Sequence, residues 1–303
     1  MRARNLVCHW NFSSFVVCVF TTLFTGVVFG GTVISWGDDS YGQVSNTPVG
    51  DNFISIFAGD SVSMALTDDG TIEAWGKDSD GLVTDKPTGT DFVFLDAGQA
   101  HSLALTKTGK IVSWGWDKFG QVSDTPSGSD FIEIAAGDFH SVALTSAGKL
   151  ISWGIDKQGQ ISDTPTDGTY IQIAAGGQNS IAIKKDGTIV SWGSKEDNRI
   201  ADTPTTGNFK TVSAGQFHLI GVKEDGTIVS WGSNKFGQVS ETPKTKEFLK
   251  IEGCGVFTLA LSAEGTIEFW GGFHTQGFDS TTQAKEKYSD IACGQLHALA
   301  LQK

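Results

Sequence analysis

The chain has 303 residues and a formal net charge of −12, with 34 acidic against 22 basic residues. This balance argues against unaided binding to nucleic acid or to an anionic membrane surface, because both require a basic face. Glycine is abundant, at 38 residues, and Val, Ile, Phe and Trp recur among turn residues, which indicates an all-β protein.

Residues 1–30 differ from the rest of the chain. Arg2 and Arg4 precede an uncharged apolar run, residues 15–29, and Gly30 and Gly31 follow it. This layout predicts a secretory signal peptide, and a signal anchor is the alternative. The run is shorter than the roughly 20 apolar residues of a spanning helix, which favours cleavage. We therefore expect a secreted or cell-surface protein, with no membrane contact once the leader is removed.

The remaining chain repeats one unit, which is clearest over residues 131–165. FIEIAAG predicts a first strand, HSVALT a second, and SAGK a hairpin turn with Gly148 in a left-handed conformation. KLISWG then predicts a third strand and GQISDTP a fourth, less regular one. A glycine recurs after each WG loop, and in one unit Asn198 replaces it. Because Asn tolerates positive φ best after glycine, the position has a backbone role.

Tryptophan marks the period of the repeat. The seven Trp-Gly pairs are 39 residues apart and begin at Trp36, Trp75, Trp114, Trp153, Trp192, Trp231 and Trp270. A period near 40 in a β-rich chain indicates a propeller or a solenoid. The predicted units are residues 49–87, 88–126, 127–165, 166–204, 205–243 and 244–283, with one extra residue placed at Gln276.

The two ends of the repeat region complete each other. Residues 284–303 supply the first two strands of a unit, and residues 31–48 supply the third and fourth. A chain split across one repeat predicts a closed ring rather than a capped solenoid. We therefore expect one domain, residues 31–303, folded as a seven-bladed β-propeller of four-stranded blades.

The pattern AGxxHSxALTxxGxxxSWGxxxxGQxSxTP resembles the repeat of the regulator of chromosome condensation propellers. Its short, regular form is similar to bacterial members such as the propeller-type β-lactamase inhibitory proteins. The resemblance covers about residues 31–303. It implies a seven-bladed propeller that works by binding other proteins, as a guanine nucleotide exchange factor or as an inhibitor of secreted enzymes.

Antiparallel pairing places the AGxxH and WGxxxxG loops on one face, which we call the loop face. Its variable positions are rich in aromatic residues interleaved with charges, which is typical of a protein-recognition surface. The predicted partner-binding residues are Tyr41, Trp116, Phe119, Phe139, Phe217, Phe236 and Phe273. Trp116 and Phe119 are expected to be exposed, whereas packing between blades is an equal alternative for Phe139 and Phe217.

Four histidines, His101, His140, His218 and His297, share one slot of the repeat. Val62, Asn179 and Phe257 fill the same slot elsewhere, so a common catalytic or metal-binding role is not expected. A structural role is favoured, with each imidazole bonded to the backbone at the start of a strand. We expect no catalytic residues, no metal and no cofactor.

Cys254 and Cys293 lie in adjacent repeats, at the small-residue pair that ends the first strand. If that strand is innermost, the two sulfurs can meet across neighbouring blades and form a disulfide in an oxidising compartment. Two free buried thiols are the favoured alternative, because the spacing between blades can exceed the reach of a disulfide.

The leading hypothesis is a secreted, monomeric, non-enzymatic propeller that binds a protein through the loop face, for example to inhibit an extracellular enzyme. A guanine nucleotide exchange factor rests on analogy alone, and the leader, the compact units and the acidic body argue against it. A glycan- or cell-wall-binding propeller is the third hypothesis, because exposed aromatic rings also stack on sugars.

Overall fold

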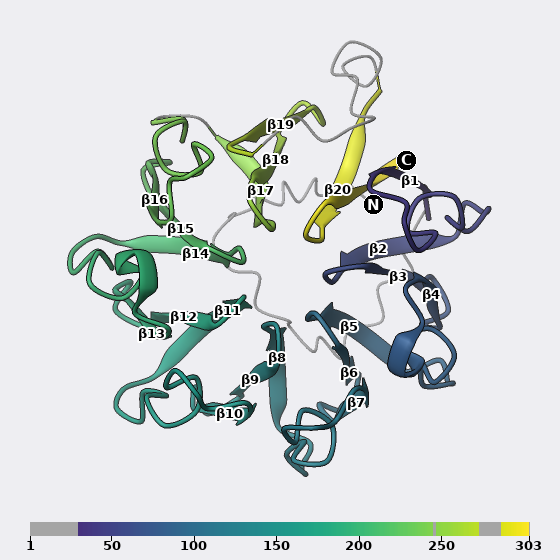
Figure 1. Ribbon diagram of the computed structural model, residues 1–303, viewed down its shortest axis with the longest axis horizontal. Coiled ribbons are helices and arrows are strands. Elements are labelled where there is room, and N and C mark those ends of the chain that lie inside the picture. Colours follow the sequence, from purple (N-terminus) through teal and green to yellow (C-terminus); the bar gives the residue numbers. More distant parts are fainter. Residues whose placement is uncertain (1–29, 245–246, 273–285, 303) are drawn as a thin grey trace, which may run out of the picture.

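The computed structural model describes residues 30–244, 247–272 and 286–302. Seven sheets stand around a central axis like the blades of a propeller, and each sheet has three antiparallel strands (Figure 1). The predicted seven-bladed, all-β architecture is therefore confirmed. We number the blades in chain order, so that blade 1 holds β2, β3 and β4, and blade 7 holds β20, β21 and β1.

Each blade has one inner, one middle and one outer strand. The inner strands are β2 (Phe53–Ala58), β5 (Phe92–Ala97), β8 (Phe131–Ala136), β11 (Tyr170–Gly176), β14 (Phe209–Ala214), β17 (Phe248–Gly253) and β20 (Tyr288–Cys293). The middle strands are β3 (Val62–Thr67), β6 (His101–Thr106), β9 (His140–Thr145), β12 (Asn179–Lys184), β15 (His218–Lys223), β18 (Thr258–Ser262) and β21 (His297–Gln302). The outer strands are β4 (Ile72–Gly76), β7 (Ile111–Gly115), β10 (Leu150–Gly154), β13 (Ile189–Gly193), β16 (Ile228–Gly232), β19 (Ile267–Trp270) and β1 (Thr32–Gly37).

Blade 7 closes the ring in the way that the split repeat predicts. Its outer strand β1 comes from the start of the described chain and pairs with β21 from the end, from Thr32 opposite Gln302 to Gly37 opposite His297. Gly31 also forms an isolated bridge with Phe53 of blade 1. The two ends of the repeat region are thus held within one sheet and against its neighbour.

The prediction of a fourth strand is wrong in the six blades whose WG loop lies within the described residues. In blade 2 the segment after the WG loop turns on itself, because Asp124 N donates to Gly120 O at 3.1 Å and Thr125 N donates to Val122 O at 3.2 Å. These i to i+4 and i to i+3 bonds use the amides that a strand would need for a ladder. Short 3₁₀ turns, η1 (Ser79–Gly81) and η2 (Glu196–Asn198), occupy part of this loop in two other blades.

Backbone conformation explains the recurring glycine of this loop. Gly120 has φ +80°, and Asn198, which replaces glycine in blade 4, has φ +58°. Both values lie in the left-handed region that favours glycine and, after it, asparagine. The backbone role predicted for the position is confirmed.

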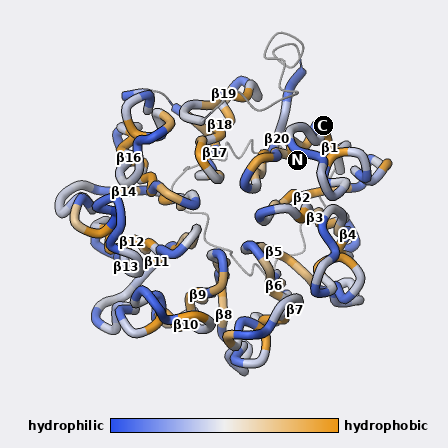
Figure 2. Tube along the Cα trace, in the orientation of Figure 1, coloured by the Kyte–Doolittle hydropathy of each residue, from blue (hydrophilic) through white to orange (hydrophobic). Residues whose placement is uncertain are grey.

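The core lies between the blades rather than in one central cluster. The middle strands β3, β6 and β9 are buried along their whole length, because a neighbouring blade covers each of their faces. Apolar colour follows the strands and polar colour gathers in the loops (Figure 2). Burial on both faces explains why HSLALT and HSVALT alternate small and large apolar residues instead of apolar and polar ones.

In blades 1 to 5 the repeated tryptophan bonds its blade to the one before it. Its ring is buried, and its indole Nε1 donates to a backbone carbonyl 32 residues earlier, in the loop of the preceding blade. The bonds are Trp75 to Gln43 O, Trp114 to Leu82 O, Trp153 to Gln121 O, Trp192 to Gln160 O and Trp231 to Arg199 O, at 2.8 to 3.0 Å.

This bond gives a stability prediction with an internal control. We expect Trp153→Phe to lower the free energy of unfolding by about 1 kcal/mol more than Trp270→Phe. Both rings are about 5 % exposed, but the Trp270 indole nitrogen has no hydrogen-bond partner among the described residues. Both substitutions remove similar buried apolar volume, so chemical denaturation of the two variants isolates the bond. Equal losses of stability would show that the indole bond contributes nothing.

Side chains of the inner strands also cross from blade to blade. Glu133 Oε2 accepts from Ile173 N at 3.0 Å, and Gln172 in the same slot of the next blade accepts from Val212 N at 3.1 Å. Asp96 Oδ2, two positions further along its inner strand, accepts from Ala136 N at 2.8 Å. The inner ring is therefore held by polar bonds to backbone amides, which fix the spacing of the blades around the axis.

No helix in the described part of the chain is long and apolar enough to cross a membrane.

Candidate protein-binding face

Strand pairing brings the two kinds of variable loop to one end of the blades, as predicted. In blade 3 His140, which begins β9, lies opposite Gly154, which ends β10. The loops are bonded directly, because Ile155 N donates to Phe139 O at 2.9 Å. The hairpin turn at Gly148 lies at the other end of the same strands. This end of the ring is the loop face.

Three of the predicted aromatic residues form one cluster on the loop face. The ring centroids of Trp116 and Phe119 are 5.3 Å apart, and Phe139 lies 5.4 Å from Trp116 and 6.4 Å from Phe119, all edge to face. Trp116 and Phe119 follow β7 of blade 2, and Phe139 lies in the β8–β9 turn of blade 3. We call these three rings the aromatic cluster.

The cluster is neither fully exposed nor fully buried. All three side chains are partly accessible, because each packs against the others across the junction between blades. The expected exposure of Trp116 and Phe119 is therefore partial. Lys157 Nζ lies 5.2 Å and Lys118 Nζ 6.0 Å from the Phe119 ring centroid, so ammonium groups border the cluster.

The other predicted aromatic residues lie elsewhere. Tyr41 of blade 7 is 52 % exposed, and Lys77 Nζ lies 5.5 Å from its ring centroid. Phe217 and Phe236 belong to blade 5, where Phe217 is half-buried and Phe236 is 39 % exposed. Phe273 lies outside the described residues. The structure thus brings three of the seven together.

Several aspartates among the predicted recognition charges support the loops instead. Asp117 Oδ1 accepts from Val122 N at 2.8 Å and Ser123 N at 2.9 Å, and the backbone bond from Ser123 is the main cause that lowers its pKa. Asp39, Asp78 and Asp156 make the same pair of bonds five and six residues ahead. The sequence offered one missed signal, namely that Asp or Asn recurs three residues after Trp in five loops.

Two hollows flank Phe139. The larger, about 390 Å³, is lined by the polar residues Asp60, Lys77, Ser79, Asp80 and Gln99 and by the apolar residues Ala100, Trp116 and Phe139. We call it the Asp60 groove. The smaller, about 90 Å³, includes Asp138, Ile155, Lys157 and Gln160 among its lining residues. The aromatic cluster is therefore next to carboxylates on both sides.

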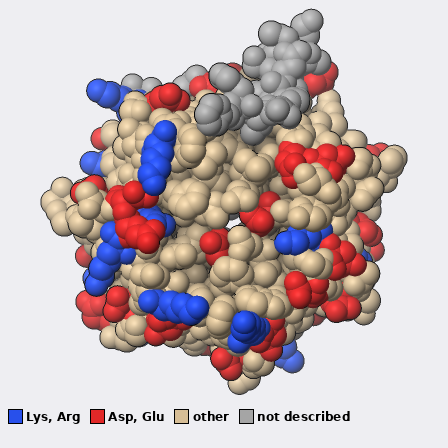
Figure 3. Space-filling view, viewed as in Figure 1, with Lys and Arg blue, Asp and Glu red and all other residues tan. Residues whose placement is uncertain are grey.

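Backbone bonds near the axis position both carboxylates. Asp60 N donates to Gly98 O at 3.1 Å and Asp138 N to Gly177 O at 2.8 Å, so each blade is tied to the next. Gln295 Nε2 donates to Gln216 Oε1 at 2.8 Å, although 79 residues separate them. In Figure 3, acidic side chains lie beside a small opening near the centre of one face.

Burial raises the pKa of both of these acids. It raises the pKa of Asp60, against the Ser61 hydroxyl and the Lys77 charge. It also raises the pKa of Asp138 to about 6, with the Asp60 charge acting in the same direction. For both carboxyls the cost of burying the charge thus exceeds the stabilisation that neighbouring groups supply.

The four histidines have structural partners, but not the backbone partners that we predicted. Each Nε2 is hydrogen-bonded to a hydroxyl on the middle strand of the next blade, and all four rings are fully buried. The pairs are His101 with Ser141, His140 with Ser180, His218 with Thr258 and His297 with Ser63, at 2.7 to 2.9 Å. Burial lowers the pKa of His140 to about 3 and of the other three to about 4.

The described residues contain no group of three or more His, Cys, Asp and Glu side chains arranged to hold a metal ion.

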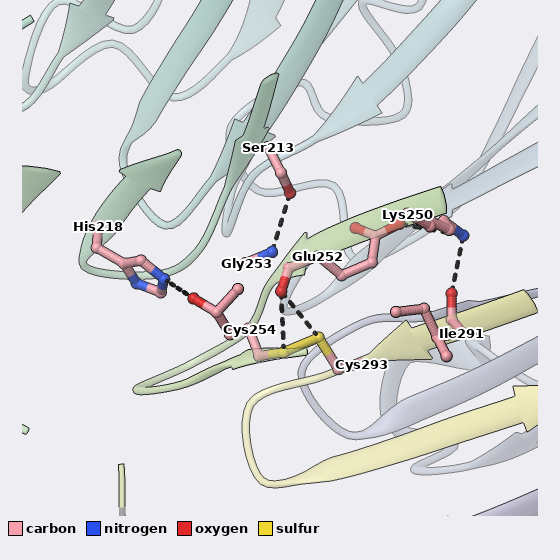
Figure 4. The surroundings of a disulfide bond; sticks show 9 residues. Ser213, His218, Lys250, Glu252, Gly253, Cys254, Ile291 and Cys293 are labelled. Carbon is pink, nitrogen blue, oxygen red and sulfur yellow. Dashed lines mark hydrogen bonds and ion pairs between the residues drawn. A yellow bond between two sulfur atoms is a disulfide. The ribbon is translucent and has the colours of Figure 1, made fainter. Parts of the chain in front are cut away.

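Cys254 and Cys293 form a disulfide between blades 6 and 7. Cys254 follows β17, Cys293 ends β20, and their Cα atoms are 5.5 Å apart. Figure 4 shows the bond beside the Glu252 carbonyl, with Lys250 reaching Ile291 across the same junction; Lys250 Nζ donates to Ile291 O at 2.8 Å. The favoured prediction of two free thiols is wrong. It assumed that neighbouring blades are too far apart for a disulfide, but the inner strands converge at the axis and bring the two cysteines within reach.

Comparison with known proteins agrees with this geometry. The Regulator of chromosome condensation (RCC1) repeat matches residues 92–121, 131–160, 170–198 and 209–238. None of the curated proteins is significantly similar in sequence.

Solved structures with the same fold are distant in sequence. Prp20p from Saccharomyces cerevisiae is 17 % identical, with a TM-score of 0.75 over 91 % of this chain and 92 % of its own. Human WBSCR16 is 17 % identical, with a TM-score of 0.70 over 84 % and 88 %. The ectodomain of the Physcomitrella patens receptor kinase CR4 is 20 % identical, with a TM-score of 0.66 over 80 % and 71 %.

The resemblance to the regulator of chromosome condensation repeat that was inferred from the sequence is thereby confirmed: the chain is a seven-bladed propeller, and four of its repeats match that family.

Proposed function

We propose that this propeller is a non-enzymatic module that binds a protein partner on its loop face, with the aromatic cluster at the centre of the contact. The observation that carries the proposal is the cluster itself. Trp116, Phe119 and Phe139 come from two blades, pack edge to face, and remain partly accessible between two hollows. Aromatic anchors surrounded by polar and charged groups are typical of binding hot spots.

The fold supports a binding role in general terms. Propellers of this repeat family are generally binding or regulatory proteins, and the structure of Prp20p is described together with its binding to Gsp1p and histones. For this chain we further propose an extracellular partner, because the leader-like residues 1–30 predict export. Inhibition of an extracellular enzyme is the concrete form that we favour.

A paired retention experiment tests the proposal. Wild type and Trp116→Ala/Phe119→Ala serve as baits for proteins of the extracellular fraction and of neighbouring organisms. We expect a protein that wild type retains and the variant loses, with about 2 kcal/mol or more of binding free energy lost for each substitution if these residues are hot spots. The titration of each single variant against that protein checks the magnitude.

Ile171→Ala is the matched control. Ile171 is 45 % exposed and lies at the far end of β11 from the loop face, so its truncation removes exposed apolar surface without touching the cluster. Circular dichroism of all variants establishes folding. If Trp116→Ala and Phe119→Ala both bind the partner with unchanged affinity, the loop face is not the binding surface. If no bait retains a protein, glycan binding is the next hypothesis.

An exchange factor for a small GTPase is the second candidate, favoured by the match in fold to yeast Prp20 over 99 % of this chain. At 17 % identity the match concerns the fold. GDP release from Gsp1, accelerated by wild type and not by the cluster variant, would favour this candidate over the inhibitor.

A further inference from the structure

The lining of the Asp60 groove combines aromatic rings with carboxylates. Trp116 and Phe139 both line it, and their mutual edge-to-face contact holds them in place. Asp60 and Asp80 line it as well, and the volume, about 390 Å³, accommodates one long side chain with its neighbouring backbone. The groove lies where blades 1, 2 and 3 meet on the loop face.

Asp60 lacks a full counter-charge. Its Oδ2 accepts a hydrogen bond from Ser61 at 3.1 Å, and no ion pair includes it among the described residues. Lys77 also lines the groove, but its ammonium lies 5.5 Å from the centroid of the Tyr41 ring. Burial raises the pKa of Asp60, so a cation brought to the groove would stabilise a charge that solvent stabilises poorly.

The two hollows differ in their charged lining residues. The smaller one has one charge of each sign, Asp138 and Lys157, whereas in the Asp60 groove the two carboxylates Asp60 and Asp80 outnumber the single ammonium of Lys77. The charges of Asp60 and Asp138 disfavour each other, and the whole chain has a net charge of −12. The Asp60 groove therefore favours a basic ligand over an acidic one.

We propose that the Asp60 groove receives an arginine side chain of the protein partner, with the guanidinium between the Trp116 and Phe139 rings and the Asp60 carboxylate. Arginine fits better than lysine because its planar cation stacks on aromatic rings and presents a fork of donors to a carboxylate. The inference rests on the proposed function, since it names the partner chemistry of the same face.

The test uses a defined peptide and the full chain labelled with 5-fluorotryptophan. The probes are acetyl-Gly-Leu-Arg-Leu-Gly-amide and the same peptide with citrulline, a neutral isostere, in place of arginine. Fluorine NMR reports on Trp116, whose resonance is assigned by its loss in Trp116→Phe. We expect the arginine peptide to shift this resonance, with at least fivefold weaker binding for the citrulline peptide and for Asp60→Asn. Ile171→Ala should bind as wild type does.

Equal binding of the two peptides, no binding of either, or full affinity in Asp60→Asn would overturn the inference. The citrulline arm needs no mutation and keeps the test decisive if Asp60→Asn fails to fold. The proposed function fails by a different result, which is retention of the protein partner by Trp116→Ala/Phe119→Ala. If Trp116→Ala/Phe119→Ala loses the protein partner but the arginine and citrulline peptides bind wild type equally, the loop face remains the proposed binding surface and the arginine proposal is rejected.

Discussion

Reduction of the Cys254–Cys293 disulfide is expected to lower the free energy of unfolding by about 4 kcal/mol. The bond closes a loop of 39 residues, and removing such a cross-link returns about that much conformational freedom to the unfolded chain at 25 °C. Chemical denaturation with and without a reductant measures the difference. Alkylation before reduction, followed by mass analysis of the two cysteine peptides, establishes the oxidised starting state.

The repeat itself supplies the control for this prediction. The slot of Cys254 holds Gly in the other six blades, as in Gly137, and the slot of Cys293 holds Ala in five of them, as in Ala136. Cys254→Gly/Cys293→Ala therefore restores the repeat and removes only the bond. It should unfold like reduced wild type and should not respond to reductant. An oxidised wild type no more stable than this variant would contradict the prediction.

Acid should destabilise the fold through its buried histidines. The pKa of His140 is lowered to about 3 by burial, whereas an unfolded histidine titrates near 6.5. Because the pKa of His140 is lower in the folded state, the stability that neutral His140 contributes is present above pH 6.5. It is lost as the pH falls toward the pKa of the folded state. Between pH 7 and 4.5 we expect His140 to cost about 2 kcal/mol of unfolding free energy.

A difference measurement isolates this effect. The raised pKa values of Asp96, Glu133 and Asp138, at about 7, 8 and 6, act in the opposite direction because these acids bind protons more readily when folded. His140→Asn removes one imidazole and copies Asn179, which fills the same slot in blade 4. The gap in stability between wild type and variant should narrow or reverse as pH falls. Parallel pH curves would show that His140 does not titrate in this range.

The ring could be predicted because the repeat encodes it redundantly. Seven tryptophans at one spacing fixed the number of blades, and the complementary ends predicted closure. What the pattern did not contain was the identity of the bonds between blades. Trp153 reaches Gln121 at a distance of 32 residues and His140 reaches Ser180 at 40, so each partner lies almost one repeat away.

The candidate site was predictable only in outline. Antiparallel pairing placed Trp116 and Phe139 on one face, but their contact depends on the angle between blades 2 and 3, which no residue pattern reports. Asp117 was interpreted as a recognition charge because it lies among the charged residues interleaved with aromatic ones in the WG loops. Its two backbone bonds are visible only once the loop is folded.

The pairing of β1 with β21 determines when the ring can close during synthesis of the chain. The paired residues of these strands are separated by 260 to 270 positions in the chain. The outer strand of blade 7 therefore leaves the ribosome before the other described strands, and its partner β21 leaves after them. Until β21 is made, β1 has no sheet to join, and without blade 7 the blades 1 and 6 each present an uncovered side. A chaperone that shields such a side would act on the nascent chain and lose its binding site when the ring shuts.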